Sequence, residues 1–278
     1  MKKQILLLGS LALGGFALIM LIAFWPDRQP GQQPRSPAIK PTMEELKGPN
    51  KGLRVLFVGN SHTFANDVPD LVAKLAKASD VDRPLLTWME SPGGTSFKMH
   101  WDNGRVQQLL GEAKWDLVVL QDQSAMPLMH RNQRDQESAP FARKLNEKIK
   151  ESGARTVLFM TWGYKDGYFP MQKMARDAYQ ELATDLKADL VPVGTAWEKA
   201  LKARPDLDMW TDGNHATMKG SYLAACVFYA VFYGQSPVGN SFAAGLDAAD
   251  ARFLQETAAS VVELQPGGLA AKAPGRAQ

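Results

Sequence analysis

The sequence predicts an α/β fold, a three-layer α/β/α sandwich around a central parallel sheet of about five strands. Short apolar runs rich in β-branched residues alternate along the chain with longer segments of helical periodicity. Each intervening segment is long enough for a crossover helix, which favours parallel βαβ units with helices on both faces of the sheet. Loops of small and polar residues follow the first three runs, at the end of a parallel sheet where ligands bind.

The strands and helices follow from these patterns in chain order. Strands are predicted at 53–59, 85–89, 116–120, 155–161 and 190–193, with helical patterns from 67 and around 102–113, 135–152 and 171–187. In the helix from 67, the residues Val68, Leu71, Val72 and Leu75 fall on one face, which predicts packing against the sheet. A nearly all-apolar stretch at 222–233 predicts a further buried helix.

Composition and charge exclude several classes of protein. The 278 residues are 45% hydrophobic and 22% charged, which is ordinary for a globular protein and excludes a disordered or collagen-like chain. The single cysteine, Cys226, excludes an intramolecular disulfide and a thiolate zinc cluster. Residues 1–52 hold seven basic and three acidic residues, a net charge of +4. Because the whole chain carries +3, residues 53–278 together carry −1. That balance removes the electrostatic basis for nucleic-acid binding.

The N-terminal segment predicts a membrane anchor. Residues 5–25 form an uncharged run of 21 residues behind Lys2 and Lys3, which as a helix spans ~31 Å, close to the hydrocarbon core of a bilayer. The run lacks a small-residue cleavage site and no cysteine follows it, which excludes a lipoprotein anchor. We therefore expect residues 1–25 to anchor the chain in the inner membrane with its body in the periplasm or outside the cell. The alternative is a cleaved signal sequence and a secreted protein.

The rest of the chain divides into three parts. Residues 26–52 are rich in proline and predict an extended linker without a packed element. Residues 53–265 predict one globular domain, and residues 266–278 a frayed tail rich in Gly, Ala and Pro.

Four short polar segments hold the candidate catalytic residues. They are 59–63 (Gly-Asn-Ser-His-Thr), 93–94 (Gly-Gly), 121–124 (Gln-Asp-Gln-Ser) and 212–215 (Asp-Gly-Asn-His). Acyl transfer needs a nucleophile, a base, a group that orients the base, and donors for the developing oxyanion. Ser61, His215 and Asp212 meet the first three needs in that order. The backbone N–H groups of Ser61 and Gly94 and a side-chain amide from Gln121 or Gln123 are the predicted oxyanion donors.

These segments together resemble the SGNH (GDSL-like) hydrolase superfamily over roughly residues 53–240. Gly59-Asn60-Ser61 is similar to the nucleophile block of that family, with Asn60 where Asp is more usual, and Asp212-x-x-His215 is similar to its last block. The segment 121–124 departs from the usual Gly-x-Asn-Asp third block, and the resemblance implies that a glutamine replaces asparagine as oxyanion donor. It also implies an SGNH/flavodoxin-like sheet and a serine esterase acting on small acyl esters, including O-acetyl groups of carbohydrates.

The remaining histidines have other predicted roles. His62 is predicted as a pocket or supporting residue rather than the base, because neighbouring residues on an extended loop point apart. His100 and His130 are predicted as packing or surface residues. The tryptophans are predicted in the core or the pocket wall.

Other functions compete with this prediction. A metallophosphoesterase needs several Asp and His ligands around two metals, and the chain has four histidines and no Asp-x-His string. We therefore predict no metal and no cofactor. A non-catalytic carbohydrate-binding module on the same fold has no need of Ser61, Asp212 and His215 together. An O-acetyltransferase of a cell-envelope or exported polysaccharide uses the same triad and differs only in its acceptor. The predicted partners are a small-molecule or carbohydrate ester and the membrane, with no nucleic acid.

Overall fold

The computed structural model of the chain describes residues 41–48 and 51–273. The predicted anchor at 1–25 and most of the linker lie outside these described residues. Within them, no helix combines the length and the apolar character that crossing a membrane requires.

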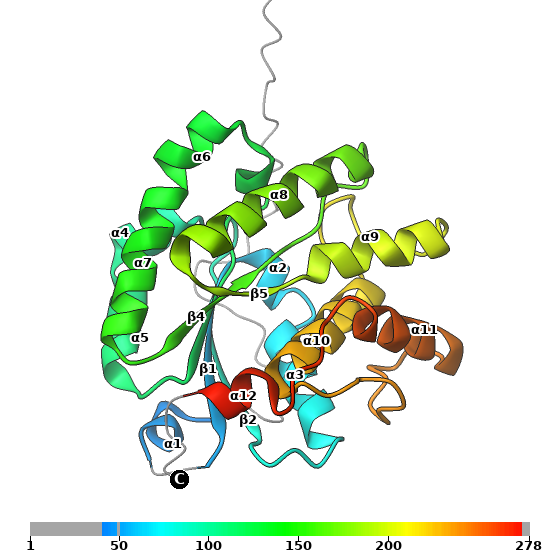
Figure 1. Cartoon of the computed structure of the whole chain (residues 1–278), viewed down its shortest axis with the longest axis horizontal. Helices are drawn as coiled ribbons and strands as arrows, with labels where there is room; N and C mark the ends of the chain where they lie inside the picture. The colour runs from blue at the N-terminus through cyan, green and yellow to red at the C-terminus, as the bar shows by residue number, and fades with distance from the viewer. Residues whose placement is uncertain (1–40, 49–50, 274–278) are drawn as a thin grey trace, which may run out of the picture. The chain divides into compact units, whose positions relative to one another are not determined.

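A five-stranded parallel sheet forms the centre of the domain (Figure 1). Its strands lie in the order β2-β1-β3-β4-β5, and their bounds are β1 Leu53–Val58, β2 Leu85–Glu90, β3 Leu117–Leu120, β4 Arg155–Phe159 and β5 Asp189–Val191. The three inner strands are almost wholly buried, which explains why they are continuous apolar runs in the sequence. The predicted fold class and the five predicted strands are confirmed, with strand ends that differ by one or two residues.

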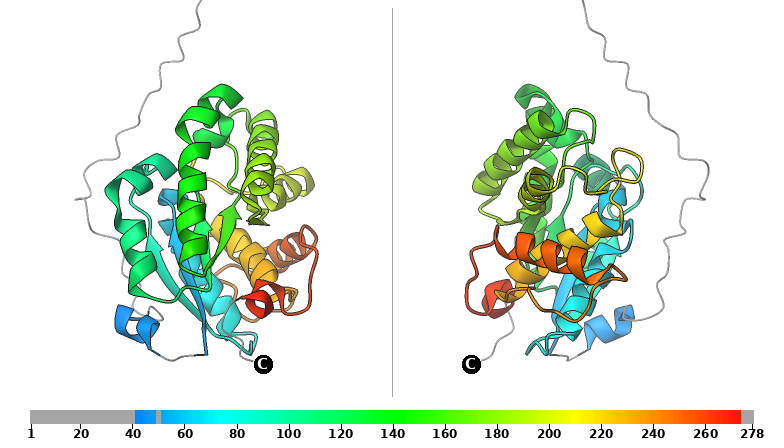
Figure 2. Two further views of the ribbon diagram at one scale, coloured as in Figure 1. Left: turned by 60° about the vertical axis from the view of Figure 1, so that its left-hand side comes forward. Right: turned by 90° about the vertical axis from the view of Figure 1, so that its right-hand side faces the viewer.

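Helices cover both faces of the sheet (Figure 2). One face carries α3 Val68–Lys77, α9 Val193–Ala203, α10 Met218–Tyr233, α11 Ala248–Ala259 and α12 Gly268–Lys272. The other carries α1 Met43–Lys47, α4 Phe97–Asn103, α5 Arg105–Glu112, α7 Ala139–Glu151 and α8 Tyr168–Leu186. The remaining short helices are α2 Ser61–Phe64, η1 Met126–Leu128 and α6 Arg131–Glu137.

Helix α10 is the predicted apolar helix at 222–233, extended to begin at Met218. Buried residues occur all around it, because it packs between the sheet and helices α3, α9, α11 and α12. Thr217 caps its N-terminus, and the loop that ends at this cap contains His215. The packing of α10 therefore holds that loop at the edge of the sheet.

The predicted linker and tail both contain a packed helix, so these two predictions are wrong in part. Helix α1 begins behind a capping box of Thr42 and Glu45, and its Leu46 is fully buried. Helix α12 buries Leu269 and Ala270 against α10. Each helix has five residues, too few for a periodic pattern to emerge from Pro- or Ala-rich surroundings.

Two predicted helices are each divided in two. The pattern at 102–113 belongs to α4 and α5, which meet at Gly104 in the left-handed region with φ +73°. The pattern at 135–152 belongs to α6 and α7, which meet at Ser138. The pattern at 102–113 includes only the last two residues of α4, and α6 has no buried residue that would give it an apolar face.

Candidate active site

The loop after β1 presents Ser61 at the start of α2. Asn60 caps this helix, and its Oδ1 accepts a hydrogen bond from the N–H of His62 at 3.2 Å. A Cβ at Gly59 would lie 2.4 Å from Thr63 Oγ1 and 2.6 Å from Gln121 Oε1. Only glycine fits there, so the turn stays tight and Ser61 sits directly beyond the end of the strand.

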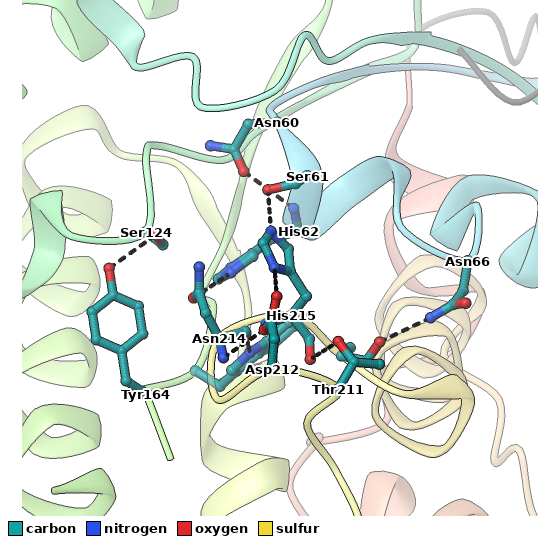
Figure 3. A network of polar contacts seen from close by, with 12 residues as sticks. Asn60, Ser61, His62, Asn66, Ser124, Tyr164, Thr211, Asp212, Asn214 and His215 are labelled. Carbon is teal, nitrogen blue, oxygen red and sulfur yellow. Dashed lines mark hydrogen bonds and ion pairs between the residues drawn. The ribbon is translucent and has the colours of Figure 1, made fainter. Parts of the chain in front are cut away.

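Ser61, His215 and Asp212 form one chain of hydrogen bonds (Figure 3). His215 Nε2 lies 2.9 Å from Ser61 Oγ, and His215 Nδ1 lies 2.7 Å from Asp212 Oδ2. The serine and the histidine are 154 residues apart in the sequence. The structure thus brings together the three residues predicted as nucleophile, base and orienting acid.

The turn at 212–215 is organised by its own aspartate. Asp212 Oδ1 accepts hydrogen bonds from the backbone N–H groups of Asn214 and His215 at 3.0 and 2.8 Å. Its Oδ2 accepts a hydrogen bond from Nδ1 of the His215 ring. Partial burial raises the pKa of Asp212, but these hydrogen bonds from His215 and Asn214 outweigh it and hold the pKa below its usual value. The carboxylate is therefore ionised at neutral pH, which directs the imidazole proton to Nδ1 and the Nε2 lone pair to Ser61.

His62 has a different environment from His215. Its ring is 2% exposed and stacks on Trp162 at 4.6 Å between centroids, and its Nε2 lies 3.0 Å from Asn214 Oδ1. Burial, followed by the nearby His215, lowers the pKa of His62 to about 4. The ring is neutral at pH 7 and is hydrogen-bonded to Asn214 rather than to Ser61, so its place agrees with a supporting residue.

Two backbone groups suit an oxyanion. The N–H of Ser61 lies in the first turn of α2, where helix N–H groups have no partner inside the helix. Gly94 lies exposed in the loop after β2, with φ +71° and nothing within 4 Å of the position of a Cβ. That left-handed conformation favours glycine, and the open space beside it suits a substrate.

Gln121 does not serve as the predicted oxyanion donor. It is fully buried, and its Oε1 accepts the N–H of Asn60 at 3.0 Å and the hydroxyl of Thr63 at 2.9 Å. Its Nε2 donates to the carbonyl of Asp122. The oxygen of this side-chain amide thus holds the loop that carries Ser61, and its nitrogen is also hydrogen-bonded within the protein.

Gln123 remains the side-chain candidate for the third donor. It is half-buried, and its Oε1 accepts the N–H of Ala125 at 2.8 Å. Within the described part of the chain its amide nitrogen makes no hydrogen bond, so this NH₂ group is the one suited to an oxyanion.

Several supporting residues escaped the sequence prediction. Asp122 is buried and its carboxylate accepts N–H groups from Phe97 and Gln123, both at 2.9 Å, and the hydroxyl of Ser138. Its own carbonyl accepts Asn60 Nδ2 at 3.1 Å. One residue therefore joins the loops that follow β1, β2 and β3. The only sequence signal for it is its place between two candidate donors.

A second set of contacts surrounds the histidine turn. Asn66 Nδ2 donates to the carbonyl of Ala216, and Trp162 Nε1 donates to the carbonyl of Asn214 at 2.9 Å. Ser124 Oγ and Tyr164 OH are 3.1 Å apart and lie to one side of the triad (Figure 3). These contacts join loops that are distant in the sequence, so no local pattern predicts them.

The other predicted positions are simpler. His100 is buried with Nε2 2.8 Å from the carbonyl of Gly59, and His130 is exposed, which agrees with packing and surface roles. Over residues 41–48 and 51–273, no group of three or more His, Cys, Asp or Glu side chains is arranged to hold a metal ion.

Comparison with known proteins gives structural relatives. No family model and no curated protein matches the sequence. A DUF4886 family protein from Bacteroides uniformis matches with a TM-score of 0.65 at 19% identity, over 75% of this chain and 94% of that chain. A proposed SGNH hydrolase from Slackia heliotrinireducens matches with a TM-score of 0.54 at 28% identity, over 64% and 97%.

A third relative has an assigned activity. A point mutant of an acetyl-xylooligosaccharide esterase from Geobacillus matches with a TM-score of 0.51 at 16% identity, over 64% of this chain and 93% of that chain. At this identity the likeness shows the fold. The described residues thus combine the fold of the SGNH, GDSL-like hydrolases with a hydrogen-bonded Ser-His-Asp triad, whose serine lies just beyond the carboxyl end of β1.

Proposed function

We propose that this chain is a serine esterase that removes small O-acyl groups from carbohydrates, outside the cytoplasm. The observation that carries the proposal is the chain of hydrogen bonds from Asp212 through His215 to Ser61, at 2.7 and 2.9 Å. These distances lie within the reach that proton transfer requires.

The proposed reaction has an acylation half and a deacylation half, and His215 takes up and returns one proton in each. Ser61 Oγ attacks the ester carbonyl while His215 Nε2 takes its proton, and the N–H groups of Ser61 and Gly94 stabilise the oxyanion. The C–O bond to the alcohol then breaks, and His215 returns the proton to the leaving alkoxide. Water, deprotonated by His215, then attacks the acyl carbonyl. The bond to Ser61 Oγ breaks, His215 returns the proton to that oxygen, and the carboxylic acid leaves. Asp212 stays ionised throughout and stabilises the imidazolium.

The carbohydrate substrate and the location have separate support. A relative of the same fold is an acetyl-xylooligosaccharide esterase, and the open space at Gly94 suits a substrate that approaches from solvent. The uncharged run at 5–25 supports an anchor and a body outside the cytoplasm. These points favour an exported esterase of acylated carbohydrates over a general lipase.

The test is an activity screen on the full-length chain in detergent. Acetyl, butyryl and octanoyl esters and an acetylated xylo-oligosaccharide are compared, each with and without a deacylated saccharide acceptor and with and without EDTA. We expect fastest release from acetyl esters, no need for the acceptor, and unchanged rates in EDTA. Ser61→Ala is the matched inactive control.

Other outcomes separate the competing functions. Acyl transfer to the saccharide in preference to water makes the chain an O-acetyltransferase. Saccharide binding without turnover makes it a binding module. Activity that EDTA removes and a divalent cation restores contradicts the proposed mechanism.

A further inference from the structure

A buried histidine next to the nucleophile is unused by the triad. His62 directly follows Ser61, and its Nε2 lies 3.0 Å from the side-chain oxygen of Asn214, which directly precedes His215. That amide oxygen only accepts hydrogen bonds, so Nε2 of His62 carries the proton and donates. The nucleophile and the base therefore have neighbours in the sequence that are hydrogen-bonded to each other (Figure 3).

This contact joins two separate parts of the fold. His62 belongs to α2, whereas Asn214 belongs to the turn between α9 and α10. Within the turn, the bonds from Asp212 hold its residues together but do not fix its distance from α2. The bond between His62 and Asn214 bridges that gap beside the contact between Ser61 and His215.

Trp162 holds both members of this pair. Its ring stacks on His62 with an interplanar angle of 14°, and its Nε1 donates to the backbone carbonyl of Asn214 at 2.9 Å. The same ring also stacks on Trp197, at 4.2 Å between centroids and an interplanar angle of 3°. Both tryptophans are almost fully buried, so the pair rests on a rigid support.

The chemistry of the pair suits a site where positive charge develops. The His62 ring lies edge to face with His215 at 5.9 Å between centroids, and His215 becomes an imidazolium during the proposed reaction. A charged group at residue 62 would oppose that imidazolium. Burial lowers the pKa of His62 to about 4, so the pair adds a hydrogen bond without adding charge.

From this geometry we infer that His62 and Asn214 are a positioning pair, which sets the distance and orientation of the His215 ring relative to Ser61. The inference rests on the proposed function of the triad. Neither residue exchanges a proton with substrate. Both act through His215, so their loss lowers kcat more than it changes KM.

The test is a double-mutant cycle in the full-length chain. His62→Ala, Asn214→Ala and the double variant are assayed for hydrolysis of p-nitrophenyl acetate and for the rate of Ser61 labelling by a fluorophosphonate. We expect each single variant to lose about 10- to 100-fold in kcat with KM changed less than about threefold. The double variant should lose no more than the worse single variant, because the two residues act as a unit.

Two further variants separate positioning from general destabilisation. His62→Gln retains an N–H donor for Asn214 and should recover part of the lost kcat. Asn146→Ala removes a buried asparagine that bonds Thr156 and the carbonyl of Leu186, away from the triad. It should lower the melting temperature and leave kcat unchanged.

The outcomes distinguish failure of this inference from failure of the proposed function. If the two single losses multiply in the double variant, or if Asn214→Ala keeps full kcat, the pair does not position His215. If the wild type hydrolyses no ester but is labelled at Ser61, the proposed function fails and the labelling rates still test the pair. A wild type that neither hydrolyses nor is labelled overturns both.

Discussion

Ser61, His215 and Asp212 lead to graded predictions at the scale of single residues. Ser61→Ala should abolish fluorophosphonate labelling and reduce turnover by about 10⁴-fold or more, and His215→Ala should cost about as much, because nucleophile and base act as a unit. Asp212→Asn should cost less than either, since the aspartate orients the ring without exchanging a proton. Steady-state kinetics with circular dichroism as a folding check measure this order. Full activity in Ser61→Ala would refute the acyl-enzyme mechanism.

Asp122 leads to a prediction about stability and pH. Burial, against the hydrogen bonds from Ser138, Phe97 and Gln123, raises the pKa of this carboxyl from 3.8 to about 6. A raised folded-state pKa means that its contribution to stability is fully present below about pH 4 and is lost as the pH rises through about 6. Asp122→Asn places a neutral group of the same shape at this position. The variant should therefore avoid the loss of unfolding free energy at high pH, which amounts to up to about 3 kcal/mol at pH 7.

Urea unfolding of the wild type and Asp122→Asn at pH 4, 5, 6 and 7 checks this sign. The two proteins should be nearly equal in stability at pH 4, and the variant should become progressively more stable above it. Other carboxyls, such as Asp212 with its lowered pKa, contribute equally to the pH dependence of both proteins, so their contributions cancel in the difference. A difference in unfolding free energy that does not change between pH 4 and pH 7 would contradict the prediction.

The residues of the triad could be predicted from the sequence, but the residues that hold them in place could not. Ser61 and Asp212-x-x-His215 stand in recognisable local patterns after predicted elements. The direction of a side chain is set by its tertiary surroundings. The amide of Gln121, a predicted oxyanion donor, therefore bonds Asn60 and Thr63 beneath the loop instead. The contact between His62 and Asn214 spans 152 residues, a separation at which a single sequence gives no sign of pairing.

At the scale of elements, helix α10 contains a glycine, Gly220, whose replacement by alanine should destabilise the protein, although this change usually stabilises a helix. A Cβ at Gly220 would lie 2.4 Å from Trp197 Cζ2 and 3.0 Å from the carbonyl of Met209. Helix propensity alone predicts that Gly220→Ala gains about 1 kcal/mol. Overpacking against the buried Trp197 should instead cost about 1–3 kcal/mol.

Gly111 in α5 is the matched control for this prediction. Its Cβ position has nothing within 4 Å and the residue is exposed, so Gly111→Ala should gain about 0.5–1 kcal/mol. Thermal unfolding of both variants measures the two effects. Stabilisation by Gly220→Ala would show that α10 can move away from Trp197.

Elements that were long or fully buried could be predicted from the sequence, and short ones could not. The inner strands are continuous apolar runs because helices cover both of their faces. Helix α1 has only two apolar residues, Met43 and the fully buried Leu46, and two residues are too few to define a period. Gly104 ends α4 and begins α5, but the apolar residues of the 102–113 pattern all follow it, so the pattern does not show that a separate helix precedes it.

At the scale of the whole molecule, the N-terminal segment leads to the last prediction. We expect the chain to keep residues 1–25 and to remain in the membrane fraction after washes with high salt and with alkali, because the uncharged run at 5–25 is long enough to span a bilayer. Fractionation and N-terminal sequencing of the purified protein check this. A mature N-terminus beyond Trp25 would show a cleaved signal sequence instead.

The separation of Ser61 from His215 has a consequence for the newly made chain. Ser61 emerges early in synthesis, but its base follows 154 residues later, in a loop held by the packing of α10 against the sheet. Until that helix docks, the serine hydroxyl has no base and is an ordinary alcohol. A nascent chain, or one exported unfolded, therefore carries an inert serine, and esterase activity begins only when nearly the whole domain has folded.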